Sequence, residues 1–217
     1  MDREELVESS SSQSVNIFIA SLQKRGSGKE TVTVSLSDGS SFFMPLALNE
    51  SWVPGYILTE EDIALLRVQD SYVRGKEWAA SRLALREDSS GRMAQKLMQR
   101  DYSPAVAKRI VADLADLGFL DDTRFASLWL RDRMRIHPEG RDSLLAGLQK
   151  RGVPADTARS CITENVSDED VDAGLERLIE KLTSRSVISV EKLIKRLQRR
   201  GFSYSSIKNK LDRDNKV

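Results

Sequence analysis

The sequence predicts a mainly α-helical fold, in which three tandem three-helix repeats form an elongated array after a small N-terminal β-hairpin or three-stranded module. Two observations carry this prediction. A leucine that precedes a basic turn recurs at Leu97, Leu148 and Leu197, at intervals of 51 and 49 residues, with apolar residues at helical spacing around each copy. A period-two alternation of apolar and polar residues lies nearer the N-terminus. A period near fifty residues is typical of repeated supersecondary units.

Each repeat is expected to contain three short helices. The residues three and four positions before each leucine are apolar, which places them on one side of a helix. Apolar residues ten and fourteen positions after the leucine indicate a second helix. A further amphipathic stretch precedes each pair, at Lys76–Arg86, Phe125–Trp129 and Val171–Leu182.

The turn between the last two helices of a repeat has its own signature. Gly152 and Gly201 suit the left-handed residue that ends a helix in a Schellman motif. Asp101 takes this place in the first copy, where we expect the turn to survive and allow for a different closing geometry. Ser103 and Ser203 then suit N-caps, and Pro104 and Pro154 suit helix starts.

The N-terminal module is predicted to contain three antiparallel strands and a helix. Residues 15–20 are apolar, residues 31–36 alternate at period two, and a turn at 37–40 leads into Phe42 and Phe43. Polar residues 23–30 indicate another turn. A helix over residues 58–72 is expected to start at the cap Thr59 with acidic residues in its first turn.

The pattern divides the chain into five segments. Residues 1–14 are expected to form a disordered tail and residues 15–75 the β-containing module. The three repeats are expected at 76–120, 121–167 and 168–217. Composition fits a soluble, cytoplasmic protein: 31% of residues are charged, Cys161 is a single cysteine, and no secretory signal or membrane-spanning stretch is apparent.

Charge is distributed unevenly along the chain. Residues 1–75 carry 6 Lys and Arg against 11 Asp and Glu, a net charge of −5. Residues 76–217 carry 28 against 22, a net charge of +6, and residues 185–217 alone carry 10 against 3. This asymmetry favours an acidic or polyanionic partner for the last repeat.

Few residues suggest catalytic or metal chemistry. His137 lacks the cysteine or carboxylate cluster that a zinc site needs, and Cys161 lies beside an apolar column, as a core residue would. Asp121 and Asp122 are better read as helix-capping acids than as metal ligands. The sequence therefore predicts a protein that is not an enzyme and has no cofactor, metal or small-molecule substrate.

Binding residues are sought among the basic side chains. The predicted helix Glu191–Arg200 places apolar residues on one side and a basic group on the other, which either contacts phosphates or carboxylates or is an ordinary solvated face. The recurring Arg100, Arg151 and Arg200 either bond the last helix carbonyls or bind a partner. The candidate partner- or DNA-binding residues are Lys192, Lys195, Arg196, Arg199, Arg200, Arg124, Arg131, Arg133, Arg135 and Arg151.

Several segments together resemble the RecX family of regulatory proteins. They are the run Leu120–Ala126, the basic helix after it, the helix that ends in Lys150–Val153, and the closing run Arg200–Ser203, with a related entry at Arg86–Ser89. The resemblance covers residues 76–217. The N-terminal module, most clearly Val34–Gly39, resembles an extension of some longer members. The chain departs from the family pattern at Arg92–Met93 and Arg100–Asp101.

The resemblance implies a role in homologous recombination and DNA repair. Members of the family bind the RecA recombinase and its filament on single-stranded DNA, and restrain filament growth, strand exchange and ATP hydrolysis; some also bind DNA. Two alternatives stay open from the residues. One is a helical DNA-binding protein without RecA specificity, and the other is a scaffold that binds a protein through its N-terminal half.

Overall fold

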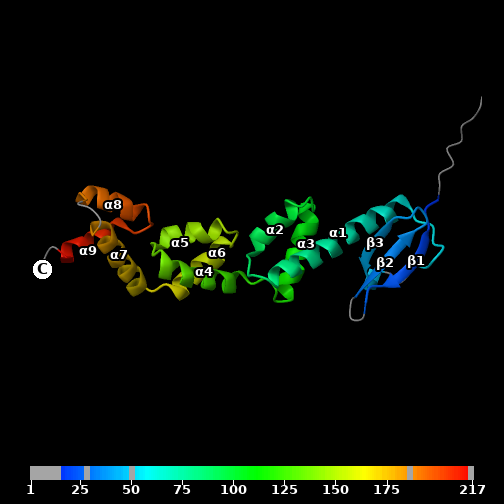
Figure 1. Cartoon of the computed structure of the whole chain (residues 1–217), viewed down its shortest axis with the longest axis horizontal. Helices are drawn as coiled ribbons and strands as arrows, with labels where there is room; N and C mark the ends of the chain where they lie inside the picture. The colour runs from blue at the N-terminus through cyan, green and yellow to red at the C-terminus, as the bar shows by residue number, and fades with distance from the viewer. Residues whose placement is uncertain (1–15, 27–29, 49–51, 185–187, 215–217) are drawn as a thin grey trace, which may run out of the picture. The chain divides into compact units, whose positions relative to one another are not determined.

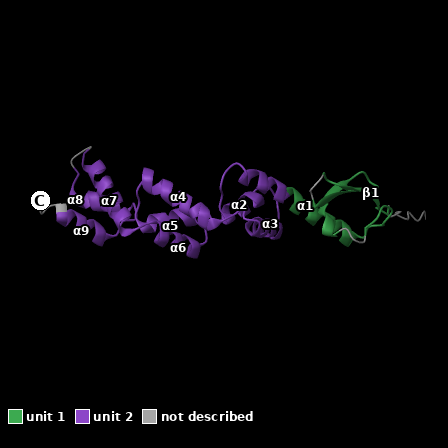
Figure 2. Cartoon of the chain, turned by 90° about the horizontal axis from the view of Figure 1, so that it is seen from below, with its two compact units in different colours: residues 1–74 green, residues 75–217 purple. Residues whose placement is uncertain are grey.

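A computed structural model describes residues 16–26, 30–48, 52–184 and 188–214, and residues 1–15, which include the expected tail, lie outside this range. The chain divides into two compact units, residues 1–74 and 75–217 (Figure 2). The described residues form nine α-helices and one three-stranded antiparallel sheet near the N-terminus (Figure 1). The predicted mainly helical fold class with a small N-terminal β module is thereby confirmed.

The first unit is built on an antiparallel sheet of strands β1 (Ile19–Lys24), β2 (Thr31–Leu36) and β3 (Ser41–Pro45), in the order β1-β2-β3. A short 3-10 helix, Leu46–Leu48, follows β3. The period-two alternation of β2 places Val32, Val34 and Leu36 in the core, because successive side chains of a strand point to opposite faces. These side chains pack with Leu66 of the following helix.

The first strand lies later than the sequence predicted. It begins at Ile19, and it extends to Lys24, into the expected turn. β1 is an edge strand whose polar residues Ser21 and Gln23 pair with Ser35 and Thr33 of β2. The apolar run that guided the prediction reflects instead the contact of Phe18 with Ile57 and the burial of Ile19.

Helix α1 (Glu60–Leu83) is continuous, where the sequence predicted two helices at 58–72 and 76–86. Its start agrees with prediction: the Thr59 hydroxyl accepts from the Asp62 amide at 3.1 Å, and Asp62 accepts from the Thr59 amide at 2.9 Å. Gly75 lies inside the helix. A Cβ there would lie 2.6 Å from Ile110 Cδ1, so this glycine allows helix α3 (Pro104–Asp116) to pack closely rather than ending α1.

The helical unit contains three successive triplets. The first combines the C-terminal part of α1 with α2 (Ser90–Met98) and α3 (Pro104–Asp116). The second contains α4 (Asp122–Ile136), α5 (Arg141–Gln149) and α6 (Ala155–Asn165), and the third α7 (Asp168–Thr183), α8 (Val190–Gln198) and α9 (Tyr204–Asp214). Leu97, Leu148 and Leu197 are each fully buried, as expected for equivalent core positions.

All three turns after the second helix of a triplet close in the same way. The amides of Tyr102, Val153 and Phe202 donate to the carbonyls of Leu97, Leu148 and Leu197, at 3.3, 3.2 and 3.3 Å. Asp101, Gly152 and Gly201 have φ values of +65°, +81° and +78°. The Schellman prediction is confirmed, and the first copy, for which a different closing geometry was allowed, has the same one.

The other helix ends agree with the predicted caps at most positions. Ser103 and Asp121 accept from the amides three residues on, Val106 and Arg124, and Gly118 ends α3 with a φ of +74°. Pro154 is the N-cap of α6 rather than its first residue. Helix α8 ends at Gln198, so Arg200 lies in the turn beyond the helix to which the sequence assigned it.

Successive triplets dock through a repeated hydrogen bond to the carbonyl of the recurring arginine. The Arg200 carbonyl accepts a 2.8 Å hydrogen bond from the Gly140 amide, and the Arg151 carbonyl accepts from the hydroxyl of Ser89, the equivalent of Gly140. At the first junction, Asp122 also accepts from the amide of Ser90 at 2.9 Å. The turn of one triplet therefore rests on the N-terminus of the second helix of the triplet before it.

Candidate functional site

The recurring arginines lie beside the first helix of their own triplet. The guanidinium of Arg100 lies 4.8 Å from the ring centroid of Trp78, and that of Arg151 lies 4.6 Å from the ring of Trp129. Trp78 and Trp129 are 51 residues apart, as are the two arginines. The helical fold thus produces the same cation–π pair twice, on α1 and on α4.

A second arginine joins each pair one helical turn later. Arg82 lies 5.8 Å from the Trp78 ring, and Arg133 lies 6.0 Å from the Trp129 ring. Leu178 and Leu182 take these two places in the third triplet, where Arg200 is retained. We call the three groups the arginine clusters: Trp78, Arg82 and Arg100; Trp129, Arg133 and Arg151; Leu178, Leu182 and Arg200.

In the middle cluster, Arg151 is surrounded by other charged side chains. Burial lowers the pKa of Arg151, and the nearby cations Arg133 and Arg92 lower it further, while Glu139 acts in the opposite direction. Arg133 donates to the Glu139 carboxylate at 2.6 Å, and Arg200 approaches the same carboxylate at 3.5 Å. The carboxylate of Glu139 therefore partly offsets the repulsion among the cations around Arg151.

The basic face predicted on α8 is present. Lys192, Lys195 and Arg196 are exposed on the helix, and Arg199 caps its C-terminus. Arg196 and Arg199 line a pocket of about 240 Å³ together with Arg200 and the side chains of Leu178 and Leu182. The structure therefore brings three of the predicted binding residues, Arg196, Arg199 and Arg200, to the third arginine cluster.

The other predicted residues lie apart from one another. Arg124 forms an ion pair with Glu87 at 2.8 Å and approaches the carbonyls of Gly118 and Phe119, which fixes it at the first junction. The three candidate arginines of α4 differ in exposure and in their partners. Arg131 is exposed, Arg133 is held by Glu139, and Arg135 pairs with Asp132 at 3.8 Å.

Of the two interpretations of the recurring arginines, the bond to a helix carbonyl is observed at Arg151. Arg151 donates to the Gly147 carbonyl of α5 at 2.9 Å, which is the carbonyl-bonding role. Arg100 stacks on Trp78 and Arg200 approaches Glu139, so neither arginine repeats that bond. The same place in the repeat therefore serves different contacts.

Sequence reasoning did not single out the basic group around Trp78. Arg82, Arg86 and Lys96 line one pocket with Trp78 and Arg100, although none was a candidate. The signal that could have found them is the repeat register, because Lys96 and Arg100 occupy the places of Arg196 and Arg200. Comparing aligned positions across repeats would have shown this basic group.

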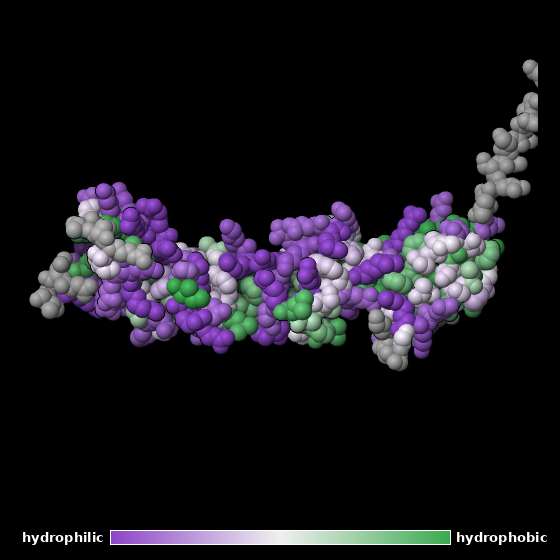
Figure 3. Space-filling model, viewed as in Figure 1, coloured by the Kyte–Doolittle hydropathy of each residue, from purple (hydrophilic) through white to green (hydrophobic). Residues whose placement is uncertain are grey.

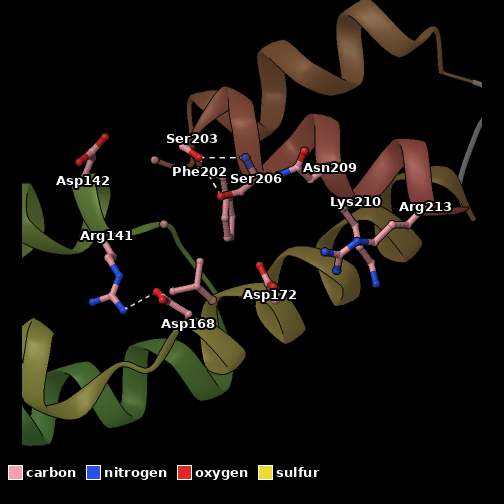
Figure 4. Close-up of a pocket in the computed structure, with 13 residues that line it drawn as sticks. Arg141, Asp142, Asp168, Asp172, Phe202, Ser203, Ser206, Asn209, Lys210 and Arg213 are labelled. Carbon is pink, nitrogen blue, oxygen red and sulfur yellow. Dashed lines mark hydrogen bonds and ion pairs between the residues drawn. The ribbon is translucent and has the colours of Figure 1, made fainter.

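A pocket at the second junction differs from the arginine clusters in its charge. It measures about 480 Å³ at the second junction and is shown in Figure 4. Asp168 and Asp172 of α7 lie opposite Lys210 and Arg213 of α9, and Arg141 pairs with Asp168 at 2.9 Å. Its charges are balanced within the pocket, so it offers an anion less than the arginine clusters do.

The side chains that could ligate a metal or act as a nucleophile lie in surroundings that do not favour either role. Within the described ranges, no group of three His, Cys, Asp or Glu side chains is placed to hold a metal ion. Cys161 is 1% exposed, and burial raises the pKa of its thiol, which disfavours the reactive thiolate.

None of the described helices is long and apolar enough to cross a membrane. Hydrophilic residues cover most of the visible face of the helical unit (Figure 3).

Fold and surface together define a helical-repeat protein that presents a cationic cluster on each of three triplets. The family model described as RecX, second three-helix domain, matches residues 121–162. A regulatory protein RecX of Treponema pallidum (strain Nichols) is 35% identical over 126 residues, which cover 58% of this chain and 76% of that protein. The chain belongs to the RecX family of regulatory proteins.

Further comparisons cover more of the chain. Regulatory protein RecX of Bacillus subtilis (strain 168) is 25% identical over 202 residues, covering 90% of this chain and 76% of that protein. A crystal structure of regulatory protein RecX superposes with a TM-score of 0.70 at 18% identity, covering 88% of this chain and 97% of the other. RecX from Lactobacillus salivarius gives a TM-score of 0.61 at 23% identity, covering 68% and 99%. At these identities the two structures establish the fold alone.

Proposed function

We propose that this protein is a non-enzymatic regulator that binds the RecA recombinase and its filament on single-stranded DNA. In this role it restrains ATP hydrolysis and strand exchange during homologous recombination and DNA repair. Membership of a family of regulatory proteins supports the regulatory role. The proposal places the protein in the cytoplasm.

The proposed binding surface rests on one observation, the recurrence of the arginine cluster on all three triplets. Arg100, Arg151 and Arg200 occupy equivalent turns, and the helical unit has a net charge of +6. A filament on DNA is a periodic polyanion, and repeated cationic sites on one chain can contact several of its phosphates or acidic side chains at once. Linked sites raise the apparent affinity without requiring that any one be strong.

The primary test is the rate of RecA-dependent ATP hydrolysis on single-stranded DNA. We expect the full-length protein to slow hydrolysis at well below one molecule per RecA protomer. An unchanged rate with a stoichiometric excess of this protein would overturn the proposal.

A matched pair of variants tests the third cluster. Arg196→Gln with Arg199→Gln removes two charges from the pocket on α8, and Lys208→Gln with Arg213→Gln removes two charges from α9. If phosphates are contacted, the first pair lowers the slope of log affinity against log salt by about 1.4 for single-stranded DNA. The second pair leaves the slope nearly unchanged although the net charge is the same.

The alternative is a DNA-binding helical protein without RecA specificity. The exposed basic side chains of α8 and its C-cap support it, because lysine and arginine contact DNA phosphates whatever the sequence. This alternative predicts DNA binding by the native protein with no effect on RecA hydrolysis. If the Arg196 and Arg199 variant loses DNA binding but still inhibits RecA, direct DNA contact is secondary.

A further inference from the structure

The first arginine cluster opens into a pocket of about 450 Å³ between the end of α1 and helix α2. Its lining includes the indole of Trp78 and the basic side chains of Arg82, Arg86, Lys96 and Arg100. This volume lies in the range of about 300–1,000 Å³ that small-molecule sites occupy. The pocket is therefore large enough for one unit of a polymer.

The charge of this pocket is largely uncompensated. Within the part of the chain that the structure describes, no carboxylate forms an ion pair with Arg82, Arg86 or Arg100. The carboxylate in the lining, Asp88, is 2% exposed and is engaged by Lys96 and by Arg92. Asp88 therefore neutralises its own neighbours and leaves three guanidinium groups facing solvent around the pocket.

Trp78 adds a flat apolar surface to these charges. Its indole is half-buried, with the guanidinium groups of Arg100 and Arg82 at 4.8 and 5.8 Å from its centroid. Aromatic rings and guanidinium planes are the side-chain surfaces on which unpaired nucleobases stack, and arginine also binds phosphate through paired donors. The pocket therefore offers a stacking surface for a base and guanidinium donors for a phosphate.

The same site is closed in the second triplet. Gly147 takes the place of Lys96 there, and a Cβ on it would lie 2.6 Å from the Cη2 atom of Trp129. The indole of Trp129 therefore lies against helix α5, and Arg151 covers it from 4.6 Å while bonding the Gly147 carbonyl. In this triplet the tryptophan is a packing residue.

The third triplet keeps an open pocket without the aromatic ring. Leu178 and Leu182 replace the tryptophan and its neighbouring arginine, and Arg196, Arg199 and Arg200 supply charge around about 240 Å³. Such a pocket can hold a phosphate but has no ring for a base. In the described part of the three triplets, the open pocket that combines a tryptophan with several cations is the one in the first triplet.

From this combination we propose that the Trp78 pocket binds one nucleotide of single-stranded DNA. The base stacks on the indole of Trp78 or on the guanidinium above it, and the phosphate is held by Arg82, Arg86 and Arg100. A duplex is disfavoured, because its bases are already stacked on one another and present no exposed face. This inference rests on the proposed function, in which the helical unit meets single-stranded DNA, and it names the DNA itself as a ligand.

The test is a titration of the full-length protein with oligothymidylate, followed by tryptophan emission and by anisotropy of a labelled oligonucleotide. Trp78→Leu introduces the residue type of the third triplet, and Trp78→Phe keeps an aromatic ring. We expect oligothymidylate to quench the emission, and Trp78→Leu to remove part of that quenching and weaken binding about 5- to 150-fold. Trp78→Phe is expected to retain most of the affinity.

An abasic oligonucleotide of the same length separates the base from the phosphate. Its binding is expected to be unaffected by Trp78→Leu. Equal weakening for both oligonucleotides, or no weakening for either, overturns the inference. Polyglutamate that binds as tightly and shows the same loss in Trp78→Leu also overturns it, in favour of an acidic protein segment.

The RecA hydrolysis assay separates the two proposals. If Trp78→Leu binds oligothymidylate as the native protein does while the native protein inhibits RecA, only the nucleotide pocket is refuted. If the native protein shows the expected Trp78-dependent binding of oligothymidylate but leaves RecA hydrolysis unchanged, the pocket stands and the proposed function fails.

Discussion

The turn of the first triplet and the turns of the second and third share one backbone geometry but differ in what they touch. Asp101 has a φ of +65° and follows the same hydrogen-bond pattern as Gly152 and Gly201. A Cβ on Gly152 would lie 2.6 Å from the Arg92 amide nitrogen, and one on Gly201 would lie 2.5 Å from the Ser143 amide nitrogen. The first turn has no earlier triplet of this kind to dock against.

This difference distinguishes two reasons why a turn can require glycine. The identity of the residue at one position does not show which reason applies. The left-handed conformation favours glycine at all three turns, but Asp tolerates that conformation better than most residues. Close backbone contact with a neighbouring triplet admits no Cβ. The turn at Asp101 therefore requires only a left-handed residue. The turns at Gly152 and Gly201 require a left-handed residue that also has no Cβ.

The largest expected effect comes from adding a Cβ at a docked turn. Gly201→Ala combines a positive φ with a contact against backbone, so we expect it to lower the free energy of unfolding by about 2–5 kcal/mol. Denaturant unfolding followed by circular dichroism measures the change. Gly118→Ala is the matched control, because Gly118 has a φ of +74° and nothing within 4 Å of the added Cβ.

That control is expected to lose only about 1–2 kcal/mol. Equal losses for Gly201→Ala and Gly118→Ala would show that the close approach between triplets contributes nothing, and the comparison of turns would then fail.

A smaller effect is expected from the side-chain bonds that accompany docking at the first junction. Asp122 accepts from both the amide and the hydroxyl of Ser90. Asp122→Ala removes these bonds, and we expect a loss of about 1.5–3 kcal/mol in the free energy of unfolding, because hydrogen bonds to a charged group are among the stronger ones. Asp142→Ala, an exposed first-turn acid on α5, controls for the helix dipole. Similar losses for the two variants would mean that the junction bonds do not stabilise the fold.

The smallest effect is expected at the turn of the first triplet. Asp101→Gly relieves the left-handed strain but increases the entropy of the unfolded chain, so we expect a gain of about 0.5–1 kcal/mol in the free energy of unfolding. Thermal unfolding checks the sign. A clear destabilisation would indicate that the Asp101 side chain makes a stabilising contact of its own.

Local signals carried much of the fold prediction. The spacing of Leu148, Gly152 and Val153 specified a helix stop through contacts within six residues, and Thr59 specified the start of α1 in the same way. The missed features depend on distant partners. Gly75 lies inside α1 because Ile110 packs there, and β1 begins at Ile19 because pairing with β2 fixes it.

The candidate site was less accessible to sequence reasoning than the fold. Charge counting found the basic face of α8, because a helix period places its lysines and arginines on one side. The α4 candidates Arg131, Arg133 and Arg135 were listed together, yet Arg133 pairs with Glu139 at 2.6 Å and Arg135 lies 3.8 Å from Asp132. Arg133 is thereby drawn to a largely buried carboxylate, whereas Arg135 stays exposed beside Asp132 of the same helix, and helix periodicity alone does not reveal this difference.

By itself, the sequence determined the triplicated helical pattern, the positions of the helix stops and the positive charge of the repeats, because each depends on neighbours along the chain. Tertiary structure alone decided which turns touch another triplet and which tryptophan faces an open pocket. The indoles of Trp78 and Trp129 occupy the same register position, but Lys96 lies opposite one and Gly147 opposite the other. Space between packed helices depends on side-chain volume across the contact, which no local periodicity encodes.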